Sequence, residues 1–258
     1  MTAVTPATAP RVRRGHGAAV YTKYELLRTI RNRRFFIFTL AFPLILYVTV
    51  AGPNRHAKAL DGVPFVLYYL SGMVAWGTMG AVVAGGGRIA LEREVGWNRQ
   101  LRVTPLSVAA YFRAKVLSSY TMAALTIALL SIVATSYGVS LSAGRWAEMI
   151  GLVLLGLIPF TILGIMLGHL LNPDAFGPVM GGGTAILSLL SGAFGPILSH
   201  GALLEVVKCL PSYWLVQAGH AAVTGGGWPL EGWIVVTAWT VVLLGVAARV
   251  YLRDTGRA

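Results

Sequence analysis

The sequence predicts an all-α membrane protein with six transmembrane helices, and three observations lead to this fold class. Hydrophobic residues make up 56% of the chain and charged residues only 12%, which is about half the charged share of an ordinary soluble domain. Six apolar stretches reach the length of about 20 residues that a helix needs to cross a bilayer. The Lys and Arg residues gather at the ends of these stretches, as expected for a chain that crosses the membrane repeatedly.

The expected spans follow one another with short connections, and the third is longer than a bilayer requires, which indicates a helical extension or a tilt. A turn at Asn172, Pro173 and Asp174 is expected to separate the fourth span from the fifth, which would open at Pro178. The segment 200–233 is too polar for a full span and too apolar for a free loop. The predicted spans are residues 35–52, 65–87, 106–137, 149–171, 178–199 and 232–252.

The residues before the first span divide into two parts. Residues 1–17 are rich in Pro, Ala, Thr and Arg and are predicted to form a disordered basic tail, which leaves 18–258 as a single transmembrane domain. Residues 18–33 carry an apolar and a polar face at helical spacing, typical of a helix lying in the membrane interface. A solvated basic anchor is the alternative. The apolar face holds Val20, Tyr24, Leu27 and Ile30, and the polar face holds Thr22, Glu25, Thr29 and Arg33.

Both chain ends are predicted to lie in the cytoplasm, because cytoplasmic segments of membrane proteins carry an excess of Lys and Arg. Seventeen of the 21 basic residues lie in the N-terminal region, the loop after the second span and the C-terminal end. The opposite orientation would export these charges and is rejected. The remaining four basic residues are Arg55, Lys58, Arg145 and Lys208.

The loop between the second and third spans concentrates charge of both signs. A short helix is expected from Arg88 and Glu92, which are four residues apart, and Gly96 is expected to stop or bend it. Thr104 is expected to cap the next helix, with Pro105 at its first position. Acidic residues contribute little to membrane orientation, whereas mixed charge suits docking to a soluble protein.

The segment EREVGWNRQLRVTPLS, residues 92–107, resembles the corresponding loop of ABC-2-type transporter permeases. The family pattern is an E-R-E-x-G run, a leucine and then V-T-P-L-S. Two positions depart from it: Trp97 stands where a threonine is more usual, and Arg99 where an acidic residue is common. The matching residues are Glu92, Arg93, Glu94, Gly96, Leu101, Val103, Thr104, Pro105, Leu106 and Ser107.

The resemblance implies that the chain is the membrane half of an ATP-binding cassette transporter in the bacterial cytoplasmic membrane. Transporters of this family are mostly exporters. Two permease chains, identical or related, would pair with two cytoplasmic ATPase subunits that bind ATP and Mg; this chain would hold no cofactor. The charged loop would be a coupling helix in a groove of the ATPase, which the N-terminal helix would also touch. Segment 200–233 would form short extracellular helices that dip into the membrane. The residues so implied in coupling are Tyr24, Glu25, Arg28, Arg88, Glu92, Arg93, Glu94, Gly96, Arg99 and Arg102.

Polar side chains within the second and fifth spans are candidates for a substrate path, since the resemblance places these spans at the dimer axis. Ordinary hydrogen bonding between helices is the alternative. His169, near the inner end of the fourth span, is expected to be structural, and a functional role stays open. The path candidates are Ser71, Trp76, Thr78, Thr184, Ser188 and Ser191.

Several other classes find little support in the sequence. Nucleic-acid binding is disfavoured because the basic residues bracket apolar runs, and the single cysteine excludes a multi-cysteine metal site. Phosphate-loop, zinc-protease and serine-hydrolase motifs are absent, and the glycine triplets at 85–87, 181–183 and 225–227 indicate close helix packing or hinges.

Three rival functions stay open: an ion-coupled secondary transporter, a membrane-embedded enzyme and a non-transporting anchor of a signalling complex. The sequence does not identify the cargo, for which a drug or antibiotic, a peptide, a lipid and a polysaccharide precursor are all compatible. A homodimer and a heterodimer are equally compatible with it.

Overall fold

A computed structural model describes residues 14–58, 62–97, 100, 103–104, 106–195 and 201–256. Helices account for the long elements of this part of the chain. In order they are α1 (Arg14–Arg31), α2 (Arg33–Ala51), α3 (Phe65–Glu94), α5 (Val108–Ser136), α6 (Ala143–Gly156), α7 (Ile158–Leu170), α8 (Pro173–Leu190), α9 (Ala202–Lys208), α10 (Pro211–Thr224) and α11 (Leu230–Gly256).

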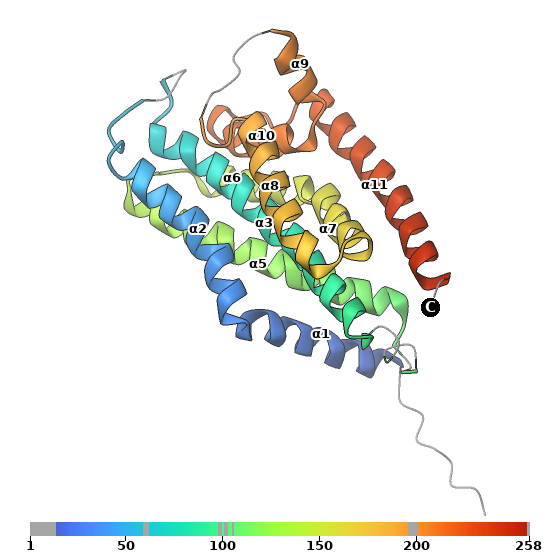
Figure 1. The fold of residues 1–258 in the computed structure, drawn as a ribbon. Helices are drawn as coiled ribbons and strands as arrows, with labels where there is room; N and C mark the ends of the chain where they lie inside the picture. The colour runs from blue at the N-terminus through green and yellow to red at the C-terminus, as the bar shows by residue number, and fades with distance from the viewer. Residues whose placement is uncertain are drawn as a thin grey trace, which may run out of the picture.

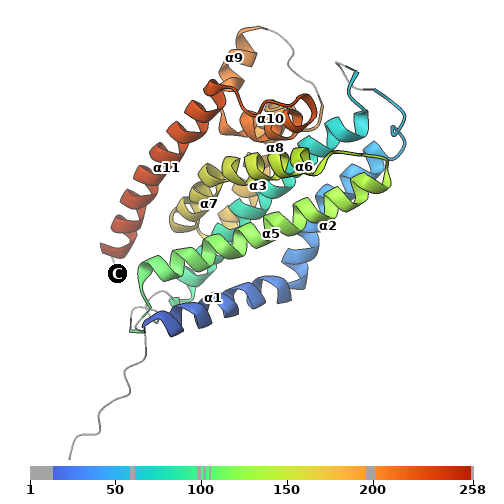
Figure 2. The same ribbon diagram turned by 180° about the vertical axis from the view of Figure 1, so that it is seen from behind.

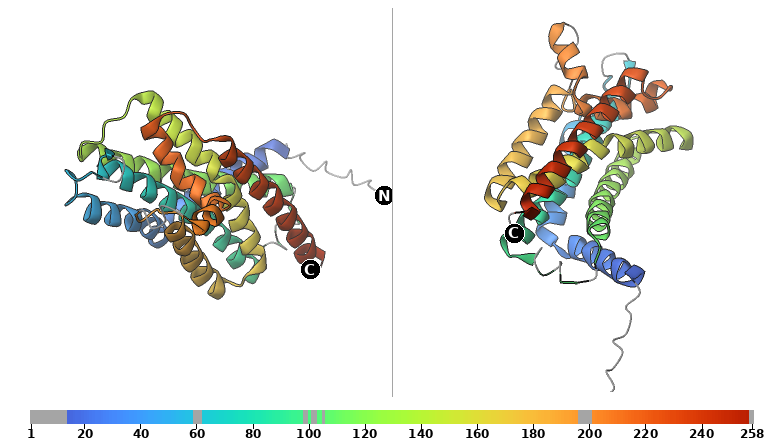
Figure 3. Two further views of the ribbon diagram at one scale, coloured as in Figure 1. Left: turned by 90° about the horizontal axis from the view of Figure 1, so that it is seen from above. Right: turned by 90° about the vertical axis from the view of Figure 1, so that its right-hand side faces the viewer.

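Helix α3 is the central element of the bundle. It packs against α2, α5, α7, α8 and α10, and most of its side chains are buried. The other long helices surround it, with α11 along one side (Figure 1, Figure 2). Helix α1 and the C-terminal end of α11 lie toward one end of the bundle, and α9 and α10 lie toward the other (Figure 3). The loop that follows α3 therefore emerges beside α1.

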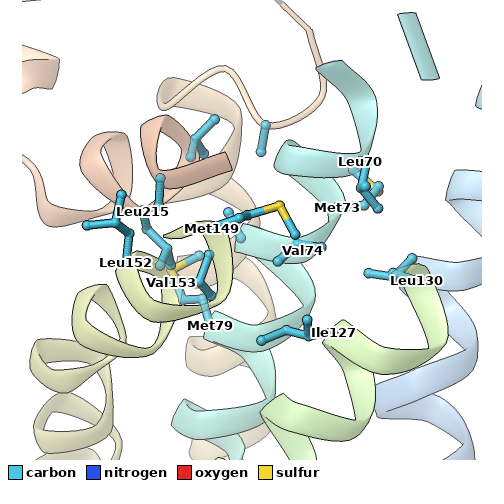
Figure 4. Close-up of a cluster of buried hydrophobic side chains, with 14 of the residues drawn as sticks. Leu70, Met73, Val74, Met79, Ile127, Leu130, Met149, Leu152, Val153 and Leu215 are labelled. Atoms are coloured by element: carbon cyan, nitrogen blue, oxygen red, sulfur yellow. The ribbon is translucent and has the colours of Figure 1, made fainter. Parts of the chain in front are cut away.

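The main core lies where α3, α5, α6 and α10 meet. Met73 and Met79 of α3 pack among aliphatic side chains of the surrounding helices, including Ile127 of α5, Met149 of α6 and Leu215 of α10 (Figure 4). These side chains are almost fully buried. The remaining long helices expose apolar side chains to the surroundings, among them most of α11, as expected where the surroundings are lipid tails and not water.

The first glycine triplet lies where α3 touches three other helices. A Cβ atom at Gly86 would overlap the backbone of Gly164 in α7, and one at Gly85 would overlap Ser119 of α5. One at Gly87 would lie 3.0 Å from the ring of Phe176 in α8. Close approach of backbones through small residues is typical of helix packing in membranes. The prediction of close packing is thus confirmed for this triplet.

The other two triplets differ from the first. A Cβ atom at Gly181, Gly182 or Gly183 would meet no atom within 4 Å, so these residues face outward. Gly225 and Gly226 have φ angles of 75° and 115°, which residues with a Cβ atom rarely adopt. This last triplet makes the turn from α10 to α11.

Four helices are long and apolar enough to cross a membrane in the part of the chain that is described: Phe65–Glu94, Val108–Ser136, Ala143–Leu170 and Leu230–Arg253. They match the second, third, fourth and sixth predicted spans. Helix α2 covers the first predicted span and qualifies only together with α1, across a bend of 55°. Helix α8 covers most of the fifth but is absent from these candidates, because its first half is rich in Gly and Pro. The six-span plan therefore stays a prediction.

Two predicted helix starts are wrong. Helix α5 begins at Val108 and not after Thr104, because the hydroxyl of Ser107 accepts the hydrogen bond from the backbone N–H of Ala110. Helix α8 begins at Pro173, where Asn172 supplies the cap by accepting from the N–H of Ala175 at 2.9 Å. Pro178 therefore lies inside the helix and does not open it.

Residues 201–229 include the short helices α9 and α10, at the end of the bundle opposite α1 (Figure 1). That these helices are extracellular and dip into the membrane stays a prediction. Two tryptophans bind the turn between α9 and α10: the indole N–H of Trp214 donates to the carbonyl oxygen of Lys208 at 2.7 Å, and that of Trp239 donates to Cys209 at 2.8 Å. These bonds hold α9 and α10 to α11.

Candidate functional site

The candidate site is a buried ion cluster formed by Glu25, Arg28, Arg88, Glu92 and Lys115. Its residues come from three helices that meet at one end of the bundle, where α1 lies against α5 and crosses the end of α3 (Figure 1, Figure 2). The paired residues lie 23 to 90 positions apart in the sequence. The cluster therefore joins α1 to both helices that flank the charged loop.

Lys115 of α5 is the centre of the cluster. Its Nζ donates to Oε1 of Glu25 at 2.8 Å and to Oε1 of Glu92 at 2.6 Å. The side chains of Lys115, Glu25 and Glu92 are only 2%, 3% and 1% exposed. Because charges with so little contact with water are costly unless paired, these three groups depend on one another.

Further side chains interact with both carboxylates. Arg28 donates to Oε1 of Glu92 at 2.9 Å, and the hydroxyl of Tyr111 donates to the other oxygen, Oε2, at 2.8 Å. Arg88 lies 3.4 Å from Oε1 of Glu25 and also donates to the hydroxyl of Thr29. Each carboxylate thus has partners on two helices other than its own.

The charges of the cluster favour the ionised form of Glu25. Burial by itself raises the pKa of Glu25, but the ammonium of Lys115 and the guanidiniums of Arg88 and Arg28 outweigh this effect, so the pKa lies below its ordinary value. The three cations exceed the two carboxylates by one positive charge, and Arg28 is the member whose side chain reaches solvent. Glu25 is therefore ionised at neutral pH and paired with the cations around it.

Helix α1 is turned with its polar face inward. Ala18, Glu25 and Thr29 are buried against the bundle, whereas Leu27 and Ile30 of the predicted apolar face are exposed. In a protein surrounded by water, an amphipathic helix would pack the opposite way. Here the ion cluster holds the polar side inside and leaves the apolar side for a non-aqueous surrounding.

The residues that directly follow α3 lie at the same end of the bundle. Helix α3 ends at Glu94, and Gly96 adopts a φ of 70°, which confirms the prediction that Gly96 stops the helix. Glu94, Val95 and Trp97 are exposed. Arg93 instead turns back and donates to the carbonyl oxygens of Gly168 and Leu171 at the end of α7, at 3.3 and 3.4 Å.

Apart from Arg93 and Gly96, the residues implied in coupling fall into three groups in the structure. Glu25, Arg88 and Glu92 are inside the protein, and their charges are used there, so they are unsuited to direct contact with another protein. Tyr24, Arg28 and Glu94 present exposed side chains. Arg99 and Arg102 lie outside the described residues. Direct docking stays a prediction for the exposed residues.

Sequence reasoning missed Lys115 and Tyr111 as members of the site. Lys115 was counted only as one of the cytoplasmic charges, although it lies inside the predicted third span. A charged residue there needs a partner, and that requirement was the available signal. The identity of the partners was not readable, because they lie 23 and 90 residues away.

The path candidates are mostly occupied by bonds within the chain. The hydroxyls of Ser71, Thr78 and Thr184 donate to backbone carbonyl oxygens of their own helices. Ser191 bonds both the carbonyl oxygen of Leu187 and the hydroxyl of Ser212. The bond from Ser191 to Ser212 joins α8 to α10, as the alternative of hydrogen bonding between helices requires, whereas the other three bond within their own helices. A role in a substrate path stays a prediction for these four.

The other two path candidates are packed as well. Ser188 is buried, and Trp76 packs edge-on against Phe42 and Phe194, with ring centroids 5.4 and 5.1 Å apart. A path formed between two copies of the chain stays a prediction. His169 is buried beside the rings of Phe112 and Tyr251, which agrees with the structural role expected for it.

Comparison with known proteins identifies the family. A family model described as "ABC-2 type transporter" matches residues 18–223, which extend from α1 into α10 and include the whole ion cluster. The chain belongs to the ABC-2 type transporter family. The permease is also 24% identical over 230 residues to a protein of Bacillus subtilis (strain 168) named "Putative transport permease YvfS", an alignment that covers 85% of this chain and 91% of that protein.

The family and the apolar helices together make the chain a membrane protein and a permease of an ABC transporter. Transporters of this class draw on an ATPase partner in general. The ion cluster therefore lies in the part of the permease where α1 and the loop after α3 leave the bundle.

Proposed function

We propose that this permease is the membrane half of an ABC exporter, in which separate ATPase subunits bind ATP and Mg and drive alternating access in a pair of permease chains. The observation that carries the proposal is the ion cluster. It binds α1 to the end of α3 and the start of α5, so that the two segments expected to meet an ATPase form one mechanical unit.

The cluster offers a route for force. A partner that displaces the exposed loop around Glu94 and Trp97 would act on α3 and α5 directly and on α1 through Glu92 and Lys115. Since α3 is the central helix of the bundle, its displacement reaches α2, α7, α8 and α10 by contact. Binding energy shifts such an equilibrium only if the two states present the loop differently to the partner.

The orientation in the proposal rests on charge and on the arrangement of the helices. Helix α1 and the C-terminal end of α11 lie at the same end of the bundle (Figure 3), and most basic residues belong to segments at this end. Cytoplasmic placement of this end satisfies the excess of positive charge expected inside. The outward apolar face of α1 supports a position in the inner membrane interface.

The proposal assigns different roles to Glu92 and Glu94, which are only two residues apart. Glu94 is exposed, so Glu94→Lys should weaken co-purification with the ATPase on the order of tenfold, or 1.4 kcal/mol, with no change in thermal stability. Glu92 is buried, so Glu92→Gln should lower the melting temperature of the purified permease. A matched control is Lys58→Glu, which reverses a charge on the exposed loop before α3, at the other end of the bundle.

The measurements are assembly and ATP turnover in vesicles with the candidate ATPase, together with the melting temperature of each variant. Assembly that Lys58→Glu weakens as much as Glu94→Lys would place the docking surface elsewhere. Transport by the purified permease in vesicles with no ATPase present would overturn the proposal as a whole and favour a secondary carrier.

A further inference from the structure

A groove of about 700 Å³ lies between α1 and α5, and none of the five residues of the ion cluster lines it. Its lining is mostly apolar. Leu26, Leu27 and Ile30 of α1 and Leu117 of α5 make the floor, and two basic side chains, Lys23 and Arg113, lie among them. Ile30 and Leu117 are each 45% exposed, so the floor is open to the surroundings.

The two basic side chains have no counter-charge in the part of the chain that the structure describes. Lys23 and Arg113 are both exposed, and no carboxylate lines the groove. The acidic residues of this region, Glu25 and Glu92, do not line the groove and are paired with Lys115, Arg28 and Arg88. The groove therefore combines an apolar floor with two uncompensated positive charges.

This combination matches one kind of occupant. A phospholipid with an anionic headgroup offers a negative charge for Lys23 and Arg113 and acyl chains for the leucines and Ile30. Basic pockets between membrane helices on the cytoplasmic side bind such headgroups, and each Lys or Arg near the surface contributes about 1 kcal/mol. A volume of about 700 Å³ is typical of a site for a drug-sized ligand, which suits a headgroup and the upper part of its chains.

We propose that the groove between α1 and α5 binds an anionic phospholipid of the leaflet in which α1 lies. The lipid phosphate accepts hydrogen bonds from Lys23 and Arg113, and its chains cover Leu26, Leu27 and Leu117. Because Glu25 of the same helix is bound in the ion cluster and lies outside the groove, the lipid and the ion cluster hold α1 at two places. Lipid composition then affects the stability of the α1–α5 contact.

The test uses the full-length permease, purified in detergent and stripped of lipid. Native mass spectrometry counts bound lipid during titration with phosphatidylglycerol or with phosphatidylcholine of the same acyl chains. The two positive charges predict a preference for phosphatidylglycerol of about thirtyfold, the equivalent of about 2 kcal/mol. Lys23→Gln with Arg113→Gln should remove this preference, and Lys23→Arg with Arg113→Lys should retain it.

The matched control removes two positive charges outside the groove. Arg31 and Arg33 are exposed and lie at the junction of α1 and α2, so Arg31→Gln with Arg33→Gln should leave the preference unchanged. Equal loss in both double variants, or equal binding of the two lipids by the unmodified chain, would overturn the proposal. Displacement of bound phosphatidylglycerol by soluble glycerol phosphate would also overturn it, since the acyl chains would then add nothing.

Photolabelling with a phosphatidylglycerol analogue in bilayer nanodiscs tests the location of the lipid site. Labelled peptides should map to α1 between Ala19 and Ile30 and to α5 around Leu117. Labelling confined to other helices would refute the site, as would protection of this face by a second permease copy. The measurement needs no ATPase, so it can fail while the docking experiment succeeds, and the reverse also holds.

Discussion

Replacement of Lys115 by Met gives the most direct measure of the ion cluster. Met has nearly the same volume, so the change removes the charge and both hydrogen bonds with little loss of packing. Glu25 and Glu92 then lose the donor that lies 2.8 and 2.6 Å from their oxygens. Arg88 and the partly exposed Arg28 remain, but neither contacts both carboxylates at such short distances.

The expected loss follows from burial. Removal of one partner of a buried ion pair costs about 3–5 kcal/mol, because the other charge stays behind in a poorly solvated place. For a chain of this size, about 2–4 °C of melting temperature corresponds to each kcal/mol. Lys115→Met should therefore lower the melting temperature by about 6–20 °C.

Lys208 supplies the control, because it forms a pair of the same chemistry at the surface. Its Nζ lies 2.7 Å from Oε1 of Glu205, whose side chain is 69% exposed, so Lys208→Met should leave the melting temperature nearly unchanged. Intrinsic tryptophan fluorescence during heating in detergent measures both variants. The double variant Lys115→Met with Glu92→Gln should recover part of the loss, since one stranded carboxylate is removed as well.

Two outcomes would refute this reasoning. A shift of the melting temperature that is equally small for Lys115→Met and Lys208→Met would show that the cluster is solvated in the membrane. Strict additivity of Lys115→Met and Glu92→Gln would show that the two residues do not interact.

Two further predictions concern backbone contact and pH. Gly86→Ala should destabilise the permease by about 1–3 kcal/mol, because its Cβ would overlap the backbone of Gly164. Gly182→Ala is the control and should be neutral or slightly stabilising, since its Cβ would meet nothing within 4 Å. The same thermal assay checks both variants. The pKa of Glu25 is lowered in the folded state from its ordinary 4.5, so its ionised form stabilises the fold above pH 4.5, and this contribution is lost as the pH falls below 4.5. The melting temperature of the unmodified chain should accordingly fall more steeply than that of Glu25→Gln between about pH 6 and pH 3.

Much of the helical plan could be predicted from the sequence. Long apolar runs identify α3, α5, the pair α6 and α7, and α11, because the length of a membrane helix is set by the bilayer. Helix ends were less predictable. Ser107 and Asn172 cap their helices in place of the residues expected, since several neighbouring residues offer the same capping chemistry and the backbone chooses among them.

The side of α1 that faces the bundle could not be predicted from its pattern. The pattern distinguishes an apolar from a polar face, but which face turns inward depends on what the rest of the chain presents. Here Arg88, Glu92 and Lys115 present charge, so the polar face is the one that is buried. The same dependence explains why Glu25 looked available for a partner protein.

The contacts of α3 change in character over about two turns of the helix, and this change accounts for the position of the charged residues in the sequence. At Gly85 and Gly86 the backbone of α3 touches the neighbouring helices. Such close packing through small residues is typical within the hydrocarbon region, because it buries no polar side chain. Further along the helix, Arg88 and Glu92 form ion pairs with charged residues of α1 and α5, and buried charges of this kind require such partners. A dense charged segment between two apolar ones is thus required by the inside of the protein as well as by its surface. Glu92 is bonded to residues of α1 and α5, whereas Glu94, two residues later, is exposed and is the residue proposed to meet the ATPase.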